Sequence, residues 1–71
     1  MKTLEQLNSI EKEFNKYFEI ASEANKKILE FNIKEIKQGL TKKEMYDRAI
    51  ALLSRANAEF EMNNLKKAIE A

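Results

Sequence analysis

The sequence contains no cysteine, histidine, proline or tryptophan, and its 71 residues include a single glycine, Gly39. Without cysteine no disulfide can form, and without cysteine and histidine a zinc site lacks its two best ligands. The same two absences remove the commonest general base and the strongest side-chain nucleophile. A lone glycine also excludes a glycine-rich phosphate-binding loop. We therefore expect a protein that is not an enzyme and that holds no metal or cofactor.

Long apolar runs and a strong net charge are also missing. No segment approaches the ~20 consecutive apolar residues of a membrane-spanning helix. Glu5 stands where a signal peptide would have its apolar region, so no signal peptide is expected. A net charge of +1 gives no overall attraction to DNA or to a lipid surface. These features predict a cytoplasmic protein with no membrane contact.

The length limits the fold to a single domain over residues 1–71. A core of this size contributes roughly 3–5 kcal/mol to stability, and small folds usually add a disulfide, a metal or a partner. Because the sequence excludes a disulfide and disfavours a metal, we expect burial against a protein partner or against a second copy of the chain.

The first half of the chain carries the pattern of one long helix. Apolar or small residues recur at alternating spacings of three and four: Leu7, Ile10, Phe14, Tyr17, Ala21, Ala24, Ile28 and Phe31. This period is that of a helix packed along another helix, and no strand produces it. Thr3 and Gln6 have the spacing of a capping box, and nothing breaks the pattern before Gly39. The pattern predicts a helix over residues 4–38.

A short turn follows at residues 39–41. Gly39 stands where a helix commonly ends on a left-handed residue. Thr41 and Glu44 have the spacing of a second capping box, and Leu40 and Met45 that of a hydrophobic staple. So short a link makes the two helices antiparallel neighbours. The sequence therefore predicts an all-α antiparallel helical hairpin whose second helix covers about residues 42–70.

The apolar pattern of the second helix changes along its length. Its predicted inner face is first Met45, Ala49, Leu52, Leu53, Ala56 and Phe60, and then Ala58, Met62, Leu65 and Ile69. Asn63 and Asn64 lie at the change, and asparagine favours caps over helix interiors. The helix either continues there, or kinks, or restarts as a short third helix. Folding the chain about residue 40 gives the expected pairing between the two helices.

Further apolar residues lie off these predicted faces, and two helices cannot bury them all. They would form a larger exposed patch than monomers usually carry. We expect a protein interface, either in a homo-oligomer, most simply a dimer that forms a helical bundle, or with a partner helix. The alternatives are a wide inner face or a third helix that covers the patch. The predicted interface residues are Phe18, Leu29, Ile33, Ile36, Leu40 and Ile50.

These observations favour a non-enzymatic protein–protein interaction module, such as a small adaptor, chaperone or inhibitor. The excess of lysine over arginine is typical of an AT-rich genome, such as that of a low-GC bacterium or a phage. One alternative is a nucleic-acid-associated protein that uses the lysines near the turn, although no aromatic residue is interleaved with them for base stacking. A further alternative is a small regulatory subunit of a larger enzyme. The candidate nucleic-acid contacts are Lys34, Lys37, Lys42 and Lys43.

Overall fold

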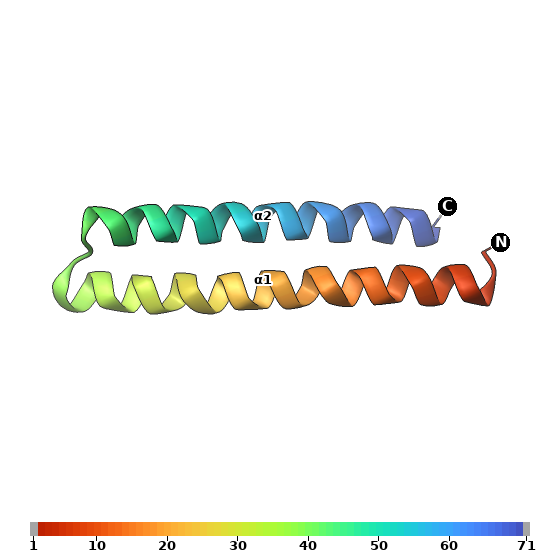
Figure 1. The fold of residues 1–71 in the computed structure, drawn as a ribbon, viewed down its shortest axis with the longest axis horizontal. Coiled ribbons are helices and arrows are strands. Elements are labelled where there is room, and N and C mark those ends of the chain that lie inside the picture. Colours follow the sequence, from red (N-terminus) through yellow and green to blue (C-terminus); the bar gives the residue numbers. More distant parts are fainter. Residues whose placement is uncertain (1, 71) are drawn as a thin grey trace.

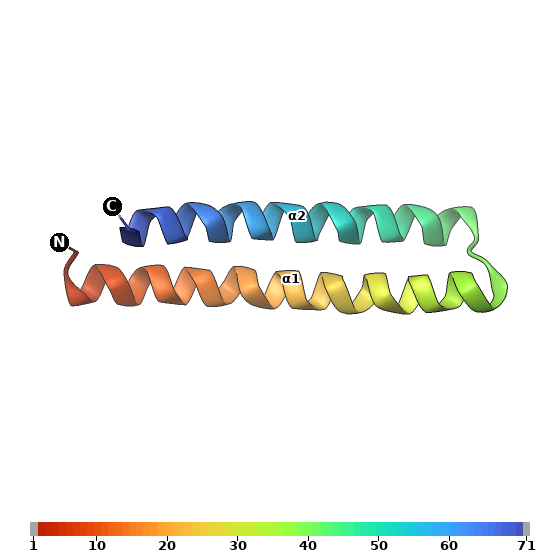
Figure 2. The same ribbon diagram turned by 180° about the vertical axis from the view of Figure 1, so that it is seen from behind.

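In a computed structural model the chain forms two long helices joined by a short turn, and the structure describes residues 2–70. Helix α1 spans Leu4–Gln38 and helix α2 spans Lys42–Glu70. The helices lie side by side and run in opposite directions, so the start of α1 and the end of α2 lie at the same end of the molecule (Figures 1 and 2). The predicted antiparallel helical hairpin is confirmed.

Both helices begin with a capping box. The Thr3 hydroxyl accepts a hydrogen bond from the Gln6 N–H at 3.2 Å, and the Gln6 side chain accepts one from the Thr3 N–H at 3.0 Å. At the start of α2 the Thr41 hydroxyl accepts from the Glu44 N–H at 3.1 Å, and the Glu44 carboxylate accepts from the Thr41 N–H at 3.0 Å. Each box satisfies two amides that have no partner inside the helix.

The turn depends on the backbone of Gly39, which has φ 80° and ψ 168°. Its N–H donates to the Glu35 carbonyl at 3.1 Å and closes the last turn of α1. The positive φ agrees with the prediction. The extended ψ differs from the value near +47° of a left-handed helical cap, and this combination of angles is essentially restricted to glycine. Gly39 therefore turns the chain sharply away from α1 rather than adding one more residue to its end.

Helix α2 is continuous through Asn63 and Asn64. Within residues 2–70 the structure contains no third helix, so nothing folds back over the outer surface of the hairpin. The outer apolar residues of both helices are therefore left uncovered by the chain itself.

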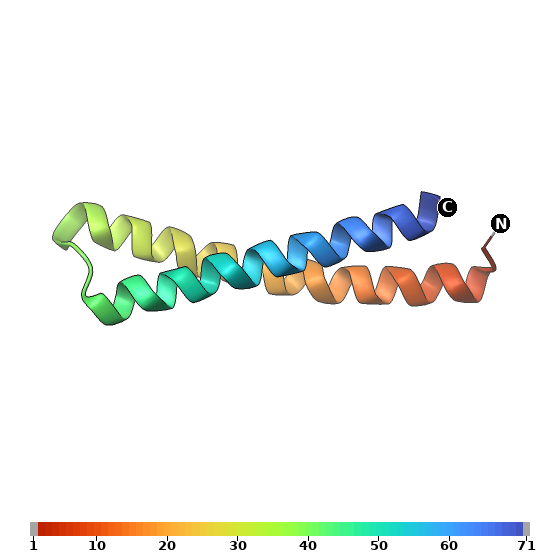
Figure 3. The same ribbon diagram turned by 90° about the horizontal axis from the view of Figure 1, so that it is seen from above.

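The helices pack in the register that folding about residue 40 predicts. Arg48 reaches Asn32, and Arg55 reaches Asn25, and each pair lies at equal distances from the turn. The two helices cross in projection when the molecule is seen from above, so they wind across each other (Figure 3).

Helix α1 buries the face that the sequence predicts, whereas α2 does not bury the first of its two predicted inner sets. Ala24 and Ile28 of α1 are buried, and most other residues of its predicted face are half-buried. On α2 the buried residues are Ala51 and Ala58, whereas the predicted inner residues are exposed: Met45, Ala49, Leu52, Leu53, Ala56 and Phe60. The predicted inner face of the first half of α2 is therefore wrong.

The physical reason lies in the residues on the two sides of α2. Ala51, Ser54 and Ala58 are small, so this side lets the two backbones approach closely. Arg48 and Arg55 border the same side and reach polar groups of α1. Turning the large aliphatic side chains inward would separate the helices and break these bonds. In the second predicted set Ala58 is buried and Met62 and Leu65 are half-buried, as predicted, whereas Ile69 at the end of the helix is exposed.

The resulting molecule is a thin rod of 53 × 15 × 13 Å. Its buried side chains are Ala24, Ile28, Ala51 and Ala58, three of which are alanine. The accessible surface is 5849 Å². A compact monomer of its mass, 8.3 kDa, would expose roughly 4,600 Å². The hairpin thus exposes about 1,200 Å² more than a globular chain of equal mass.

Candidate protein-interaction surface

Polar bonds across one side of the hairpin hold α2 in its orientation. The two Nη atoms of Arg48 donate to the Glu35 carboxylate at 3.0 and 3.1 Å, and Nη1 also donates to the Asn32 carbonyl oxygen at 3.0 Å. These bonds and the charge of Arg48 lower the pKa of Glu35, and the same carboxylate raises the pKa of Arg48. Arg55 donates to Asn25 at 2.9 Å. Because the fork of an arginine fits a carboxylate closely, Arg48 fixes the rotation of α2 about its axis.

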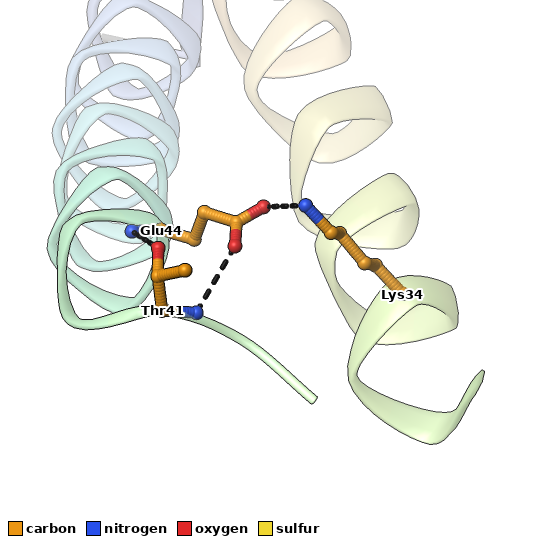
Figure 4. Close-up of polar contacts among 3 residues, drawn as sticks. All are labelled: Lys34, Thr41 and Glu44. Atoms are coloured by element: carbon orange, nitrogen blue, oxygen red, sulfur yellow. Dashed lines mark hydrogen bonds and ion pairs between the residues drawn. The ribbon is translucent and has the colours of Figure 1, made fainter. Parts of the chain in front are cut away.

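A second polar cluster ties the turn to α1 (Figure 4). Lys34 donates to the Glu44 carboxylate, whose other oxygen accepts from the Thr41 N–H. Chiefly through the bond from Lys34, and next through the Thr41 amide, the pKa of Glu44 falls to about 2. The capping residue of α2 is thus also the ion-pair partner of α1.

The outer side of α2 carries a row of exposed apolar and small residues. We call it the α2 outer face, and it consists of Met45, Ala49, Leu52, Leu53, Ala56 and Phe60. Leu53 and Phe60 are 62% and 64% exposed. On α1, Leu29, Ile33 and Ile36 form a shorter α1 outer row, in which Ile36 is 85% exposed. Helix α2 thus covers its small residues and exposes its large ones, which places its apolar surface on the outside of the hairpin.

The structure does not bring the predicted interface residues into one patch. Leu29, Ile33 and Ile36 are exposed in the α1 outer row, and Phe18 is exposed further toward the open end. Leu40 is half-buried in the turn.

The remaining predicted interface residue, Ile50, lines a groove between the helices. The groove has a volume of about 890 Å³, and its apolar and small lining residues are Ile20, Ala24, Phe31, Ile50, Ala51 and Ser54. Its charged rim consists of Lys16, Glu19, Glu23, Lys27, Glu30 and Asp47. We call this side of the hairpin the groove face. Arg48 and Arg55 directly follow Asp47 and Ser54, which line the groove. Because one residue along a helix turns the side chain by about 100°, the two arginines lie on the opposite side of the helix pair.

The α2 outer face is the candidate interaction surface that the sequence analysis missed. Its residues were recognised as a helical stripe but were assigned to the inside of the hairpin. The signal against that assignment was the second stripe, in which Ala51, Ser54 and Ala58 alternate with Arg48 and Arg55. Small residues flanked by arginines suit a close helix contact with polar bonds at its edge.

The four lysines near the turn do not act alike. Lys34 is bonded to Glu44 (Figure 4), while Lys37, Lys42 and Lys43 are exposed. Within residues 2–70 no group of three acidic side chains is arranged to hold a metal ion. In the same part of the chain no helix combines the length and the apolar character that crossing a bilayer requires.

Comparison of the chain with protein-family models, with curated proteins and with solved structures gives no match. Function must therefore be argued from the surface itself.

Proposed function

We propose that the protein is a non-enzymatic protein–protein interaction module that covers its outer apolar residues with another polypeptide. The observation that carries this proposal is the inverted placement of side chains on α2. Ala51 and Ala58 are buried, while Leu53 and Phe60 are more than half exposed. An adaptor, a small chaperone or an inhibitor would use such a surface to bind an apolar helix or a second copy of the chain.

Stability supports the same reading. Within residues 2–70 the core has four buried side chains, three of them alanine, which is small even for a chain of this length. Burial of a large aliphatic or aromatic side chain contributes about 1.5–3 kcal/mol. The exposed residues of the α2 outer face and the α1 outer row therefore hold more potential stabilisation than the contact between the two helices. Association makes that stabilisation available to the fold.

The test compares the wild-type protein with charged variants of its outer surface by sedimentation velocity, alone and in a lysate of the source cells. We expect the wild type to associate with itself or to sediment with one protein in a fixed ratio. Leu53→Glu should abolish the association if the other polypeptide covers the α2 outer face, and Ile36→Glu should abolish it if the α1 outer row is covered. Both variants should retain the helical circular dichroism spectrum. Lys26→Glu, an exposed change outside both apolar sets, is the control and should associate normally. A wild-type protein that stays monomeric and captures nothing would overturn the proposal.

A further inference from the structure

The charge of the hairpin is divided between its two ends. Residues 24–56, which form the turn half, carry eight Lys or Arg and four Asp or Glu. The remaining residues, which form the open half, carry five Lys or Arg and eight Asp or Glu. The halves therefore have net charges of +4 and −3 at opposite ends of a rod 53 Å long. Two such rods attract each other when they lie side by side in opposite directions.

The rim of the groove repeats this complementarity at the scale of single residues. The α1 side of the rim reads Lys16, Glu19, Glu23, Lys27 and Glu30. Lys16 and Glu30 stand seven residues before and after Glu23, and Glu19 and Lys27 stand four residues before and after it. When the row is reversed about Glu23, each outer charge meets one of the opposite sign. The four outer charges of the row are thus complementary to those of an antiparallel copy of α1, and only Glu23 meets its own counterpart at the centre.

Helix α2 offers an apolar row along the edge where the groove face meets the α2 outer face. Ile50 lines the groove, and Leu53, Asn57 and Phe60 follow it at helical spacings of three and four. In the hairpin register Asn57 lies beside Glu23, because the two are equally far from the turn. A reversal about this level brings Leu53 close to Phe60 of the second copy and Asn57 close to its own counterpart.

We propose that a second copy of the chain packs on the groove face through a two-fold axis at the level of Glu23 and Asn57. Helix α1 then lies antiparallel to α1 of the second copy, and α2 lies antiparallel to α2. Lys16 pairs with Glu30 of the second copy, and Glu19 pairs with its Lys27. Ile50 lies within this contact, and Leu53 and Phe60 of both copies meet along its edge on the α2 side. This inference rests on the proposed function and names a second copy of the chain as the polypeptide that covers the groove face and the adjoining edge of the α2 outer face.

The exposed area agrees with a dimer. If each hairpin buries its excess of about 1,200 Å², the interface totals about 2,400 Å², which lies within the range of about 2,000–5,000 Å² for obligate homodimers. The alternative two-fold axis, parallel to the helices, would stack α1 on α2 of the second copy. It would place the charged rim residues of α1 against Leu53 and Phe60. It would also place the two positive turn halves side by side, and the two negative open halves side by side. The charges therefore select the antiparallel arrangement.

The dimer leaves the α1 outer row uncovered. Ile33 and Ile36 lie on the side of α1 that faces neither α2 nor the groove. A further protein can therefore bind there without displacing the second copy.

The decisive experiment is a charge exchange, with the dimer dissociation constant measured by sedimentation equilibrium. The two-fold axis creates two contacts between residue 27 of one copy and Glu19 of the other. Lys27→Glu turns both into like-charge pairs, so it should weaken dimerisation about tenfold or more. Glu19→Lys should do the same. The double variant restores two opposite-charge pairs and should return to within about threefold of the wild type. Lys26→Glu is the matched control, because Lys26 is an exposed neighbour of Lys27 outside the rim, and it should leave the constant unchanged within about twofold.

The absence of native cysteine allows a direct test of the axis. In the single-cysteine variants Glu23→Cys and Asn57→Cys, a short bis-maleimide reagent should crosslink the cysteine to the same residue of the second copy. Cysteines at Lys26→Cys and Ala49→Cys lie away from the axis and should remain uncoupled at the same protein concentration.

The outcomes separate this inference from the proposed function. Rescue by the double variant together with crosslinking at residues 23 and 57 supports the dimer. A dimer that Ile36→Glu dissociates and that ignores the charge exchange overturns this arrangement but keeps the proposed function. A wild-type monomer that still binds another protein through Ile36 has the same meaning. A monomer that binds nothing overturns both.

Discussion

At the scale of single residues, Glu44 connects the two helices. It caps the start of α2 and receives a hydrogen bond from Lys34 of α1, and its pKa lies near 2 instead of 4.5 (Figure 4). A carboxylate whose pKa is lowered by folding stabilises the folded state fully above its unfolded pKa, and this contribution disappears as the pH falls through the folded value. Glu44 therefore makes the fold sensitive to acid between about pH 4.5 and about pH 2.

Glu44→Gln tests this effect. Glutamine still accepts from the Thr41 amide, but it neither titrates nor pairs with the charge of Lys34. We expect the wild type to have the higher melting temperature near neutral pH, and the difference should shrink to zero as the pH approaches about 2. Circular dichroism melts of both proteins at matched pH values measure it. A difference that stays constant across this range would contradict the assignment.

Gly39 supplies a second prediction, because its φ of 80° and ψ of 168° are strained for any L-residue with a side chain. A β-carbon added there meets no atom within 4 Å, so only the backbone opposes a substitution. Gly39→Ala should lower the free energy of unfolding by about 1–3 kcal/mol in urea denaturation. Gly39→Asn should cost about as much, since asparagine tolerates the left-handed helical region rather than this extended one. An asparagine variant as stable as the wild type would mean that the turn adopts the ordinary left-handed cap.

At the scale of elements, the orientation of α2 can be measured with cysteine substituted for four of its alanines. Ala51 and Ala58 are buried, whereas Ala49 and Ala56 are exposed. We expect Ala51→Cys and Ala58→Cys to react with a thiol reagent roughly tenfold or more slowly than the two exposed variants. All four changes are small and lie on one helix, so each pair controls for the other. The reverse order would place Leu53 and Phe60 inside the hairpin.

The sequence predicted some of these elements well and others not. Thr3, Gly39 and Thr41 carry strong local signals for the ends of helices, so the hairpin and its register followed from short-range patterns. The face of α2 did not, because that helix has two stripes of apolar or small residues, and local pattern reading favours the more hydrophobic one. Only the approach of α1, with Glu35 placed to bind Arg48, decides which stripe turns inward. The predicted interface residues stay a prediction, which the association of the charged variants tests.

At the scale of the whole molecule, the hairpin is long and thin for its mass. Its radius of gyration is 16.1 Å, whereas a compact domain of 71 residues would have roughly 11 Å. A rod of this kind gains compactness only by adding a second layer of helices. The whole-molecule property to measure is therefore the dependence of stability on concentration.

We expect the melting temperature of the wild type to rise with protein concentration, because the unfolded chain does not dimerise. Added salt should reduce this dependence, since it screens the partly exposed charges of the groove rim. Leu53→Glu should melt at one temperature at every concentration. Differential scanning calorimetry over a wide range of concentration measures both effects, and a wild type with a constant melting temperature would argue against association.

The short turn also sets the order in which the hairpin can assemble. Each contact between the helices closes a loop through Gly39, and the loops are shortest beside the turn and longest at the open end. Loop closure costs least entropy where the loop is shortest. We therefore expect pairing of the helices to start at the turn and to proceed toward the open end. During synthesis the turn and its flanking residues emerge together, whereas the beginning of α1 must wait for the end of α2. The residues that are made first are therefore the last to find their partners.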